Sequence, residues 1–111
     1  MTWKIKYYNQ VLEKDILNLP SGLLARYLRL TDMMIKFGPN LGLPHTKQIE
    51  NGLYELRLKS KEGISRVFYC TKTAKKIIML HSFIKKSQKT PKKEIKIAKL
   101  RKKEVVNNGS F

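Results

Sequence analysis

Acidic residues, cysteine and long apolar runs are all scarce in this chain of 111 residues. Its single cysteine, Cys70, cannot form an internal disulfide, which is typical of proteins in a reducing compartment. No apolar run approaches the roughly 20 residues needed to cross a bilayer. The N-terminal residues, charged from Lys4 on, do not form an apolar signal segment. We therefore expect one soluble domain that resides in the cytoplasm.

The shortage of acidic residues leaves a large positive charge. Eight Asp and Glu stand against 24 Lys and Arg, for a formal net charge of +16 and a pI near 10.1. Residues 85–104 hold ten Lys or Arg and two Glu, so this segment alone carries +8. Such a field favours a polyanion as partner, because each neutralised phosphate releases counterions. Nucleic acid is the first expectation, ahead of an acidic protein or an anionic membrane.

The motifs of metal and nucleotide chemistry are also missing. His45, Cys70 and His81 are far apart in sequence, and no C-x-x-C or H-E-x-x-H spacing occurs. No glycine-rich phosphate loop and no serine nucleophile elbow is present either. We expect no metal and no cofactor.

Hydrophobic periodicity predicts an α+β fold. Strands are expected at residues 3–8, 53–59, 64–71 and 76–84, and helices at 11–19, 21–37 and from 91 onward. Residues 40–48 are predicted to be a loop. The result is a small antiparallel sheet, a three-stranded meander plus the N-terminal strand, with two N-terminal helices on one face and a basic C-terminal helix. Residues 1–104 form the single domain, and 105–111 form a frayed tail.

Caps and apolar stripes refine the helices. Ser21 and Thr90 are the expected N-caps, and Gly38-Pro39 ends the second helix. The buried stripe of the second helix is predicted to be Leu24, Tyr27, Leu28, Thr31, Met34 and Ile35, and one side of the last helix to be Ile97, Leu100 and Glu104.

The meander carries a polar group suited to RNA cleavage without metal. In that reaction the ribose 2′-OH attacks the adjacent phosphorus, and fixed cations stabilise the charge that develops on the phosphoryl oxygens. Arg and Lys stay protonated and serve as phosphate clamps, whereas Glu, His and Tyr can exchange protons. The candidate residues are Glu55, Arg57, Arg66, Tyr69, His81, Lys85 and Lys86.

Each candidate also has a structural explanation. Arg66 fits a solvated strand edge, Glu55 with Arg57 fits a surface ion pair, and His81 and Tyr69 fit hydrogen-bonded core residues. The lysines of the last helix fit a soluble helix face. Near-absence of acids in that helix nevertheless favours contact with a polyanion.

Three blocks of sequence resemble the RelE/ParE toxin superfamily, and most of all its phage-derived HigB-like branch. They are G-L-Y-E-L-R at 52–57, R-V-F-Y at 66–69 and L-H-S-F-I-K-K-S-Q-K-T-P at 80–91, and the resemblance extends over residues 3–104. It implies a type II toxin that enters the ribosomal A site and cuts mRNA. It also implies that Arg66 contacts the scissile phosphate, that Lys85 or Lys86 stabilises it, and that Lys47 contacts RNA.

The resemblance further implies a partner, a helix-turn-helix antitoxin of the HigA-like kind, and contact with operator DNA only through that antitoxin. This chain differs from the family pattern at the C-terminus. Several relatives end soon after the last strand with an essential Tyr or His, whereas this chain continues into a basic helix and Phe111 is no substitute. The proton-transfer residue therefore stays open among Glu55, Tyr69 and His81.

The leading prediction is a ribosome-dependent mRNA endonuclease that inhibits translation. One alternative is a ParE-like inhibitor of DNA gyrase without catalysis, and another is a non-catalytic RNA-binding or ribosome-binding protein. RNA contacts beyond the catalytic group are expected at Lys47, Arg57, Lys89, Lys92, Lys93 and Lys96.

Overall fold

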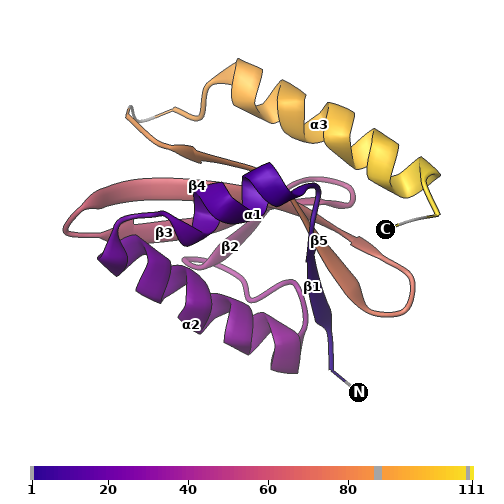
Figure 1. Ribbon diagram of the computed structural model, residues 1–111, viewed down its shortest axis with the longest axis horizontal. Coiled ribbons are helices and arrows are strands. Elements are labelled where there is room, and N and C mark those ends of the chain that lie inside the picture. The colour runs from indigo at the N-terminus through magenta and orange to yellow at the C-terminus, as the bar shows by residue number, and fades with distance from the viewer. Residues whose placement is uncertain (1, 87–88, 110) are drawn as a thin grey trace.

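The computed structural model describes residues 2–86, 89–109 and 111. In these residues the chain forms five strands and three helices (Figure 1). In chain order they are β1 (Lys4–Tyr7), α1 (Gln10–Leu17), α2 (Ser21–Phe37), β2 (Thr46–Glu50), β3 (Leu53–Ser60), β4 (Gly63–Lys72), β5 (Lys76–Ile84) and α3 (Lys92–Asn107). The α+β class and the β3–β4–β5 meander are confirmed. Among the described residues no helix has the length and apolar character to cross a bilayer.

The strands form one sheet in the order β1-β5-β4-β3-β2. Neighbouring strands are antiparallel except β1, which runs parallel to β5, with Lys4 opposite Lys76. β2 was not predicted, and the expected loop over residues 40–48 is wrong from Thr46 onward. β2 is an exposed edge strand with one aliphatic residue, Ile49, so it has no alternating pattern to recognise. Pairing with β3 defines it instead.

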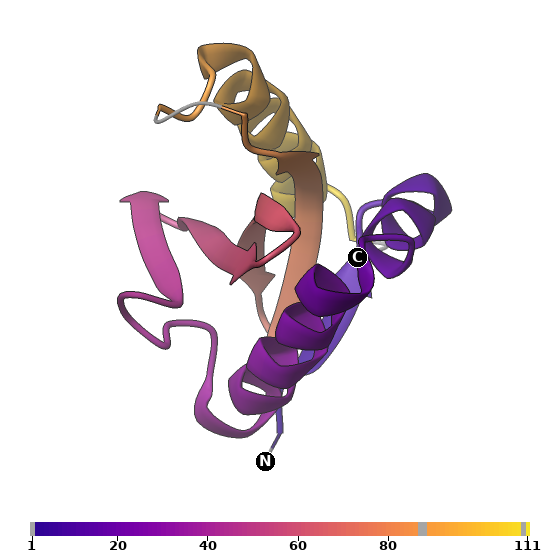
Figure 2. The same cartoon turned by 90° about the vertical axis from the view of Figure 1, so that its left-hand side faces the viewer.

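Helices cover both faces of the sheet (Figure 2). α1 and α2 pack on one face over a core that includes Ile77 and Met79 of β5. α3 packs on the other face over a second core that includes Ile78 and Leu80. This explains why β5 is apolar at consecutive positions, since each buried Ile, Leu or Met contributes about 1.5–3 kcal/mol whichever face it occupies.

The start of α2 differs from the prediction. Ser21 does not cap the helix, because it is the first helical residue and Pro20 occupies the cap position without a side-chain hydrogen bond. The Gly22 N–H donates to Glu62 Oε1 at 2.5 Å, so the β3–β4 turn supplies the missing acceptor. Gly38, with φ of +103°, ends the helix as predicted.

The buried stripe of α2 is also displaced from the predicted one. Leu28 is 49% exposed, and Leu24 and Ile35 are only partly buried. The predicted Tyr27, Thr31 and Met34 are buried, and Leu23 and Leu30 complete the stripe. The stripe thus lies about one residue earlier along the helix than the sequence suggested.

α3 begins one residue later than predicted. Thr90 is not its N-cap, since Pro91 holds that position. The predicted side of Ile97, Leu100 and Glu104 is wrong, because Leu100 is 58% exposed. The buried residues are Glu94, Ala98 and Val105.

The C-terminal segment is placed against the body of the protein. Residues 105–107, expected to be frayed, form the last turn of α3, and Val105 is wholly buried. The Phe111 ring lies 6.1 Å from the Tyr8 ring, and Lys76 Nζ donates to the Phe111 carbonyl at 3.0 Å. These contacts link Phe111 to Tyr8, which directly follows β1, and to β5.

Candidate functional site

The candidate site is built by register across β3, β4 and β5. Arg66 of β4 lies opposite Arg57 of β3 and opposite Phe83 of β5. Directly paired residues in antiparallel strands point to the same face, so these three side chains share one face of the sheet. Lys47 of β2 lies opposite Glu55 and extends the same face toward the sheet edge.

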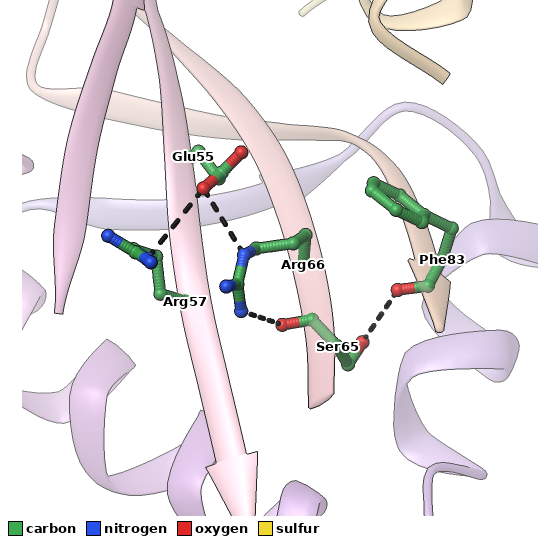
Figure 3. Close-up of polar contacts among 5 residues, drawn as sticks. All are labelled: Glu55, Arg57, Ser65, Arg66 and Phe83. Carbon is green, nitrogen blue, oxygen red and sulfur yellow. Dashed lines mark hydrogen bonds and ion pairs between the residues drawn. The ribbon is translucent and has the colours of Figure 1, made fainter. Parts of the chain in front are cut away.

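Glu55 is the centre of the polar contacts on this face (Figure 3). Its Oε1 lies 3.2 Å from Arg66 Nε and 3.8 Å from Arg57 Nε. Glu55 and Arg66 are each 5% exposed, whereas Arg57 is half-buried. Arg66 Nη1 also donates to the Ser65 carbonyl at 3.2 Å, and Ser65 Oγ donates to the Phe83 carbonyl at 3.0 Å. The Arg66 guanidinium is therefore held at Nε by Glu55 and at Nη1 by the Ser65 carbonyl.

The Arg66–Glu55 contact is an ion pair rather than a well-aligned hydrogen bond. Within the described part of the chain, Arg66 Nε is buried without a hydrogen-bond partner, even though the carboxylate is 3.2 Å away. Burial lowers the pKa of Arg66, and the charge of Glu55 opposes that shift. The guanidinium stays protonated at neutral pH, since an arginine starts from a very high pKa.

Lys85 belongs to the same electrostatic group. Its backbone N–H donates to the Ile64 carbonyl at 2.8 Å, which continues the β4–β5 pairing beyond Ile84. Partial desolvation lowers the pKa of Lys85, and the charges of Arg66, Arg57 and Lys47 act in the same direction, while Glu55 opposes them. We call Lys47, Arg57, Arg66 and Lys85, with Glu55 among them, the cationic cluster.

A cleft of about 530 Å³ opens beside the cluster. Arg57 and Arg66 line it together with Arg26 of α2 and His45 of the loop before β2. Sequence reasoning did not select Arg26 or His45 for this site. No local pattern marks them, because α2 and the loop reach the cleft only through tertiary packing. The cleft gives the guanidiniums of the cluster an opening to solvent.

The proton-exchanging candidates lie in different places. Glu55 is in the cluster. His81 shares its face but is held by α3, with Nε2 3.0 Å from Glu94 Oε1 and both side chains largely buried.

The structure does not bring Tyr69 into the site. Its side chain lies in the core under α1 and α2, where the ring stacks on Tyr54 at 5.3 Å and the hydroxyl donates to the Pro39 carbonyl. Burial raises the pKa of Tyr69, which further disfavours proton exchange near neutral pH. The cause is strand parity, because residues 66 and 69 lie on opposite faces of β4.

The remaining basic candidates surround the cluster or lie on α3. Lys86 is exposed beyond β5, and Lys89 is exposed between β5 and α3. Ser87 and Gln88, which belong to the sequence block 80–91, lie outside the described residues. The exposed lysines at the start of α3 are Lys92, Lys93 and Lys96.

In the second half of α3, Lys99, Arg101 and Lys102 make contacts within the protein. Lys99 Nζ lies 3.0 Å from Glu50 Oε1, and Lys102 Nζ donates to the Asn51 carbonyl at 2.7 Å. Arg101 donates to the Leu80 carbonyl at 2.8 Å and lies over the Tyr8 ring. The exposed cations of α3 without such contacts are Lys92, Lys93 and Lys96 in the first half and Lys103 in the second, within the described residues.

Two further kinds of site depend on His, Cys, Asp and Glu side chains. The described residues contain no group of three His, Cys, Asp or Glu placed to hold a metal ion. Cys70 is wholly buried, and burial raises its pKa to about 11, so it offers almost no thiolate as a nucleophile.

The fold and the sequence both have known relatives. The structure is similar to the crystal structure of the archaeal RelE–RelB complex from Pyrococcus horikoshii OT3, with a TM-score of 0.51 and 21% identity over 76% of this chain and 96% of that chain. The likeness shows a RelE-like fold. The family model described as "Phage derived protein Gp49-like (DUF891)" matches residues 14–103, so the chain belongs to the Gp49-like phage-derived family. No curated protein matches the chain. Family and fold together confirm the resemblance to the RelE toxin superfamily.

Proposed function

We propose that this protein is the toxin of a type II toxin–antitoxin pair and that it cuts mRNA on the ribosome. The observation that carries the proposal is the cationic cluster, in which a buried arginine and three further cations face one side of the sheet beside a cleft. A single bridging phosphate of a message strand has the size and charge to occupy such a cluster.

In the proposed reaction the ribose 2′-oxygen loses its proton to a base and attacks the adjacent phosphorus, and the bond from phosphorus to the 5′-oxygen breaks. The 5′-oxygen takes a proton from solvent, which leaves a 2′,3′-cyclic phosphate and a free 5′-hydroxyl. Arg66 and Lys85 hold the non-bridging oxygens, where negative charge increases in the transition state. Glu55 keeps the Arg66 guanidinium in place before substrate arrives, so little reorganisation is needed during the reaction. The residues of this chain supply the stabilisation, and the substrate supplies the nucleophile.

Glu55 is our candidate for the group that accepts the 2′-proton. It is the carboxylate that the fold brings into the cluster, 3.2 Å from the arginine proposed to hold the phosphate. His81 is the second candidate because it lies on the same face of the sheet. It ranks below Glu55 because its side chain is already paired with Glu94. Exposed lysines of α3 are proposed to contact ribosomal RNA.

An antitoxin is the proposed partner. The solved structure with the similar fold is itself a RelE–RelB complex. A formal charge of +16 favours a partner with acidic segments, and such complementarity makes association fast and salt-sensitive. We propose a helix-turn-helix protein in this role and the cytoplasm as the site of action.

The test compares Arg66→Ala and Lys85→Ala with Arg29→Ala and Lys14→Ala, which remove exposed cations from α2 and α1. Each variant is added to a translating extract, and the 5′ ends of the mRNA are mapped. We expect Arg66→Ala and Lys85→Ala to lower the cleavage rate by about 10²–10³-fold, as loss of a transition-state donor does elsewhere. The controls should cut at the wild-type rate.

Arg66→Lys keeps the charge and controls for folding. Wild-type cleavage by both Arg66→Ala and Lys85→Ala would contradict the proposal. DNA damage with intact mRNA would instead select the gyrase inhibitor, and harmless expression without an antitoxin would select a non-catalytic RNA-binding protein.

A further inference from the structure

We propose that Phe83 is a stacking surface for an unpaired RNA base next to the phosphate held by Arg66. This inference rests on the proposed function and assigns a nucleobase subsite to the same face of the sheet. It begins from the direct pairing of Phe83 with Arg66 across β4 and β5. Directly opposed side chains have Cβ atoms about 4.5–5.5 Å apart, so the Arg66 and Phe83 side chains leave the sheet next to each other. The Arg66 guanidinium then extends toward Glu55, so the base on Phe83 would lie one step along the strand from the phosphate.

The orientation of the ring supports this position. Figure 3 shows the Phe83 ring turned toward the side on which Arg66 and Glu55 lie, while its carbonyl accepts the bond from Ser65 Oγ. The Ser65 contact and the strand pairing fix the backbone of Phe83 relative to β4. The ring is therefore part of the cationic face rather than of the core under α1 and α2.

The ring is also held rigidly from behind. Phe68 stacks on it with centroids 5.8 Å apart and planes 23° apart, and His81 stacks on it at 6.2 Å and 20°. Phe68 is wholly buried, and His81 is held by Glu94 of α3. Phe83 itself remains partly exposed. A supported ring with an open side loses little entropy when a base stacks on it.

A single-stranded RNA base fits this chemistry best. Proteins that bind unpaired nucleic acid combine cations that follow the backbone with aromatic rings on which bases stack. Phe83 provides the ring, and Arg66 with Lys85 provides the cations. If Phe83 were only a packing residue, its replacement would change stability and leave unchanged any difference in affinity between base-containing and abasic RNA.

The experiment uses the full chain and two trinucleotides with the same number of phosphates. One is a 2′-O-methyl RNA that contains 2-aminopurine, whose fluorescence falls when it stacks, and the other has an abasic site at that position. The methyl groups prevent cleavage. The 2-aminopurine is placed at each of the three positions of the trinucleotide in turn. Affinity for both trinucleotides is measured for wild type, Phe83→Leu, Phe83→Tyr and Phe37→Leu, the last of which alters a 75% exposed ring on α2.

We expect the wild type to bind the base-containing trinucleotide roughly 5- to 100-fold more tightly than the abasic one, with quenching at one position. Phe83→Leu should lose this difference and the quenching while it binds the abasic trinucleotide as before. Phe83→Tyr and Phe37→Leu should both behave as the wild type. Unchanged abasic binding shows that the variant is folded and that its phosphate contacts are intact.

Two results would overturn the inference. One leaves the proposed function intact, and the other rejects the proposed function as well. Equal affinity of the wild type for both trinucleotides, together with Arg66-dependent mRNA cleavage, would reject the base subsite and leave the proposed function standing. Failure of the wild type to bind either trinucleotide, together with cleavage that does not depend on Arg66, would reject both.

Discussion

At the scale of single residues, the cationic cluster depends on one carboxylate. Glu55 is 5% exposed and lies between the guanidiniums of Arg66 and Arg57. Two like charges this close are tolerated because the carboxylate is shared between them. The same arrangement leaves the cluster with a surplus of positive charge, which an incoming phosphate would neutralise.

Removal of this carboxylate should make the protein less stable and more responsive to anions. For Glu55→Gln we expect a loss of about 3 kcal/mol in the free energy of unfolding, because a buried arginine is left without its counterion. Inorganic phosphate should raise the melting temperature of the variant more than that of the wild type, since the anion binds where the carboxylate charge was removed.

Chemical and thermal unfolding with and without phosphate measure both effects. Asp15→Asn is the matched control, because it neutralises an exposed carboxylate of α1. A Glu55→Gln variant as stable as the wild type, with no added response to phosphate, would contradict the assigned role of Glu55.

Strand parity decides which candidates meet. In a strand, residues separated by an even number share a face, so Arg57 and Glu55 are grouped correctly from sequence. The odd separation of Arg66 and Tyr69 already contained the information that excludes Tyr69. Lys85 could be distinguished from Lys86 only with the β4–β5 register, which the sequence does not specify.

At the scale of elements, contacts distant in sequence define the ends of the helices. The first turn of α2 takes its acceptor from Glu62, 40 residues away on the β3–β4 turn. Gly22 has room for this contact because it lacks a side chain; a Cβ there would stand 2.6 Å from Glu62 Oε1. No local signal could reveal such a cap, which explains why Ser21 was chosen instead.

Glu62→Ala should destabilise the protein modestly. We expect a loss of about 0.5–1 kcal/mol in the free energy of unfolding, the lower part of the range for a lost N-cap, because the bond is exposed. Urea unfolding measures the change in the free energy of unfolding. The slope of that free energy against urea concentration should be the same in the variant and the wild type. Glu62→Gln keeps an acceptor oxygen and should recover most of the stability. An equal loss in both variants would show that the carboxylate charge, and not the acceptor, stabilises the helix.

The strands show which parts of this fold can be predicted from sequence patterns. β3, β4 and β5 were predicted to within one or two residues, because alternation or continuous burial marks each of them. β2 was missed, because an exposed edge strand carries no such mark. The face of α3 was also misassigned, because a charged residue, Glu94, occupies a buried position as the partner of His81.

At the scale of the whole molecule, the charge is divided between two tasks. Lys99 and Lys102, in the second half of α3, bind Glu50 and Asn51 and hold the β2–β3 turn. The lysines of the first half, Lys92, Lys93 and Lys96, are exposed near the side of the sheet that carries the cationic cluster. For the RNA binding proposed above, this division predicts that the first half of α3 governs the salt dependence.

Replacement of Lys92, Lys93 and Lys96 by Gln together should reduce the slope of log K against log salt by about 2, at roughly 0.7 for each lost contact with single-stranded RNA. Fluorescence anisotropy between low and moderate salt measures the slope. The matched control replaces Lys14, Arg29 and Lys36, which are exposed on α1 and α2. Equal changes in the two triple variants would mean that net charge alone, rather than α3, sets the salt dependence.

The parallel pairing of β1 with β5 has a consequence for the newly made chain. Residues 4–7 meet residues 76–79 only after most of the polypeptide has been synthesised, and α3 packs on β5 later still. Loop closure over such a separation delays folding. The sheet, and with it the face that carries the cationic cluster, is therefore complete only late in synthesis. For the proposed toxin, this means that the surface expected to act on mRNA and to bind an antitoxin forms only when synthesis of the chain is almost finished.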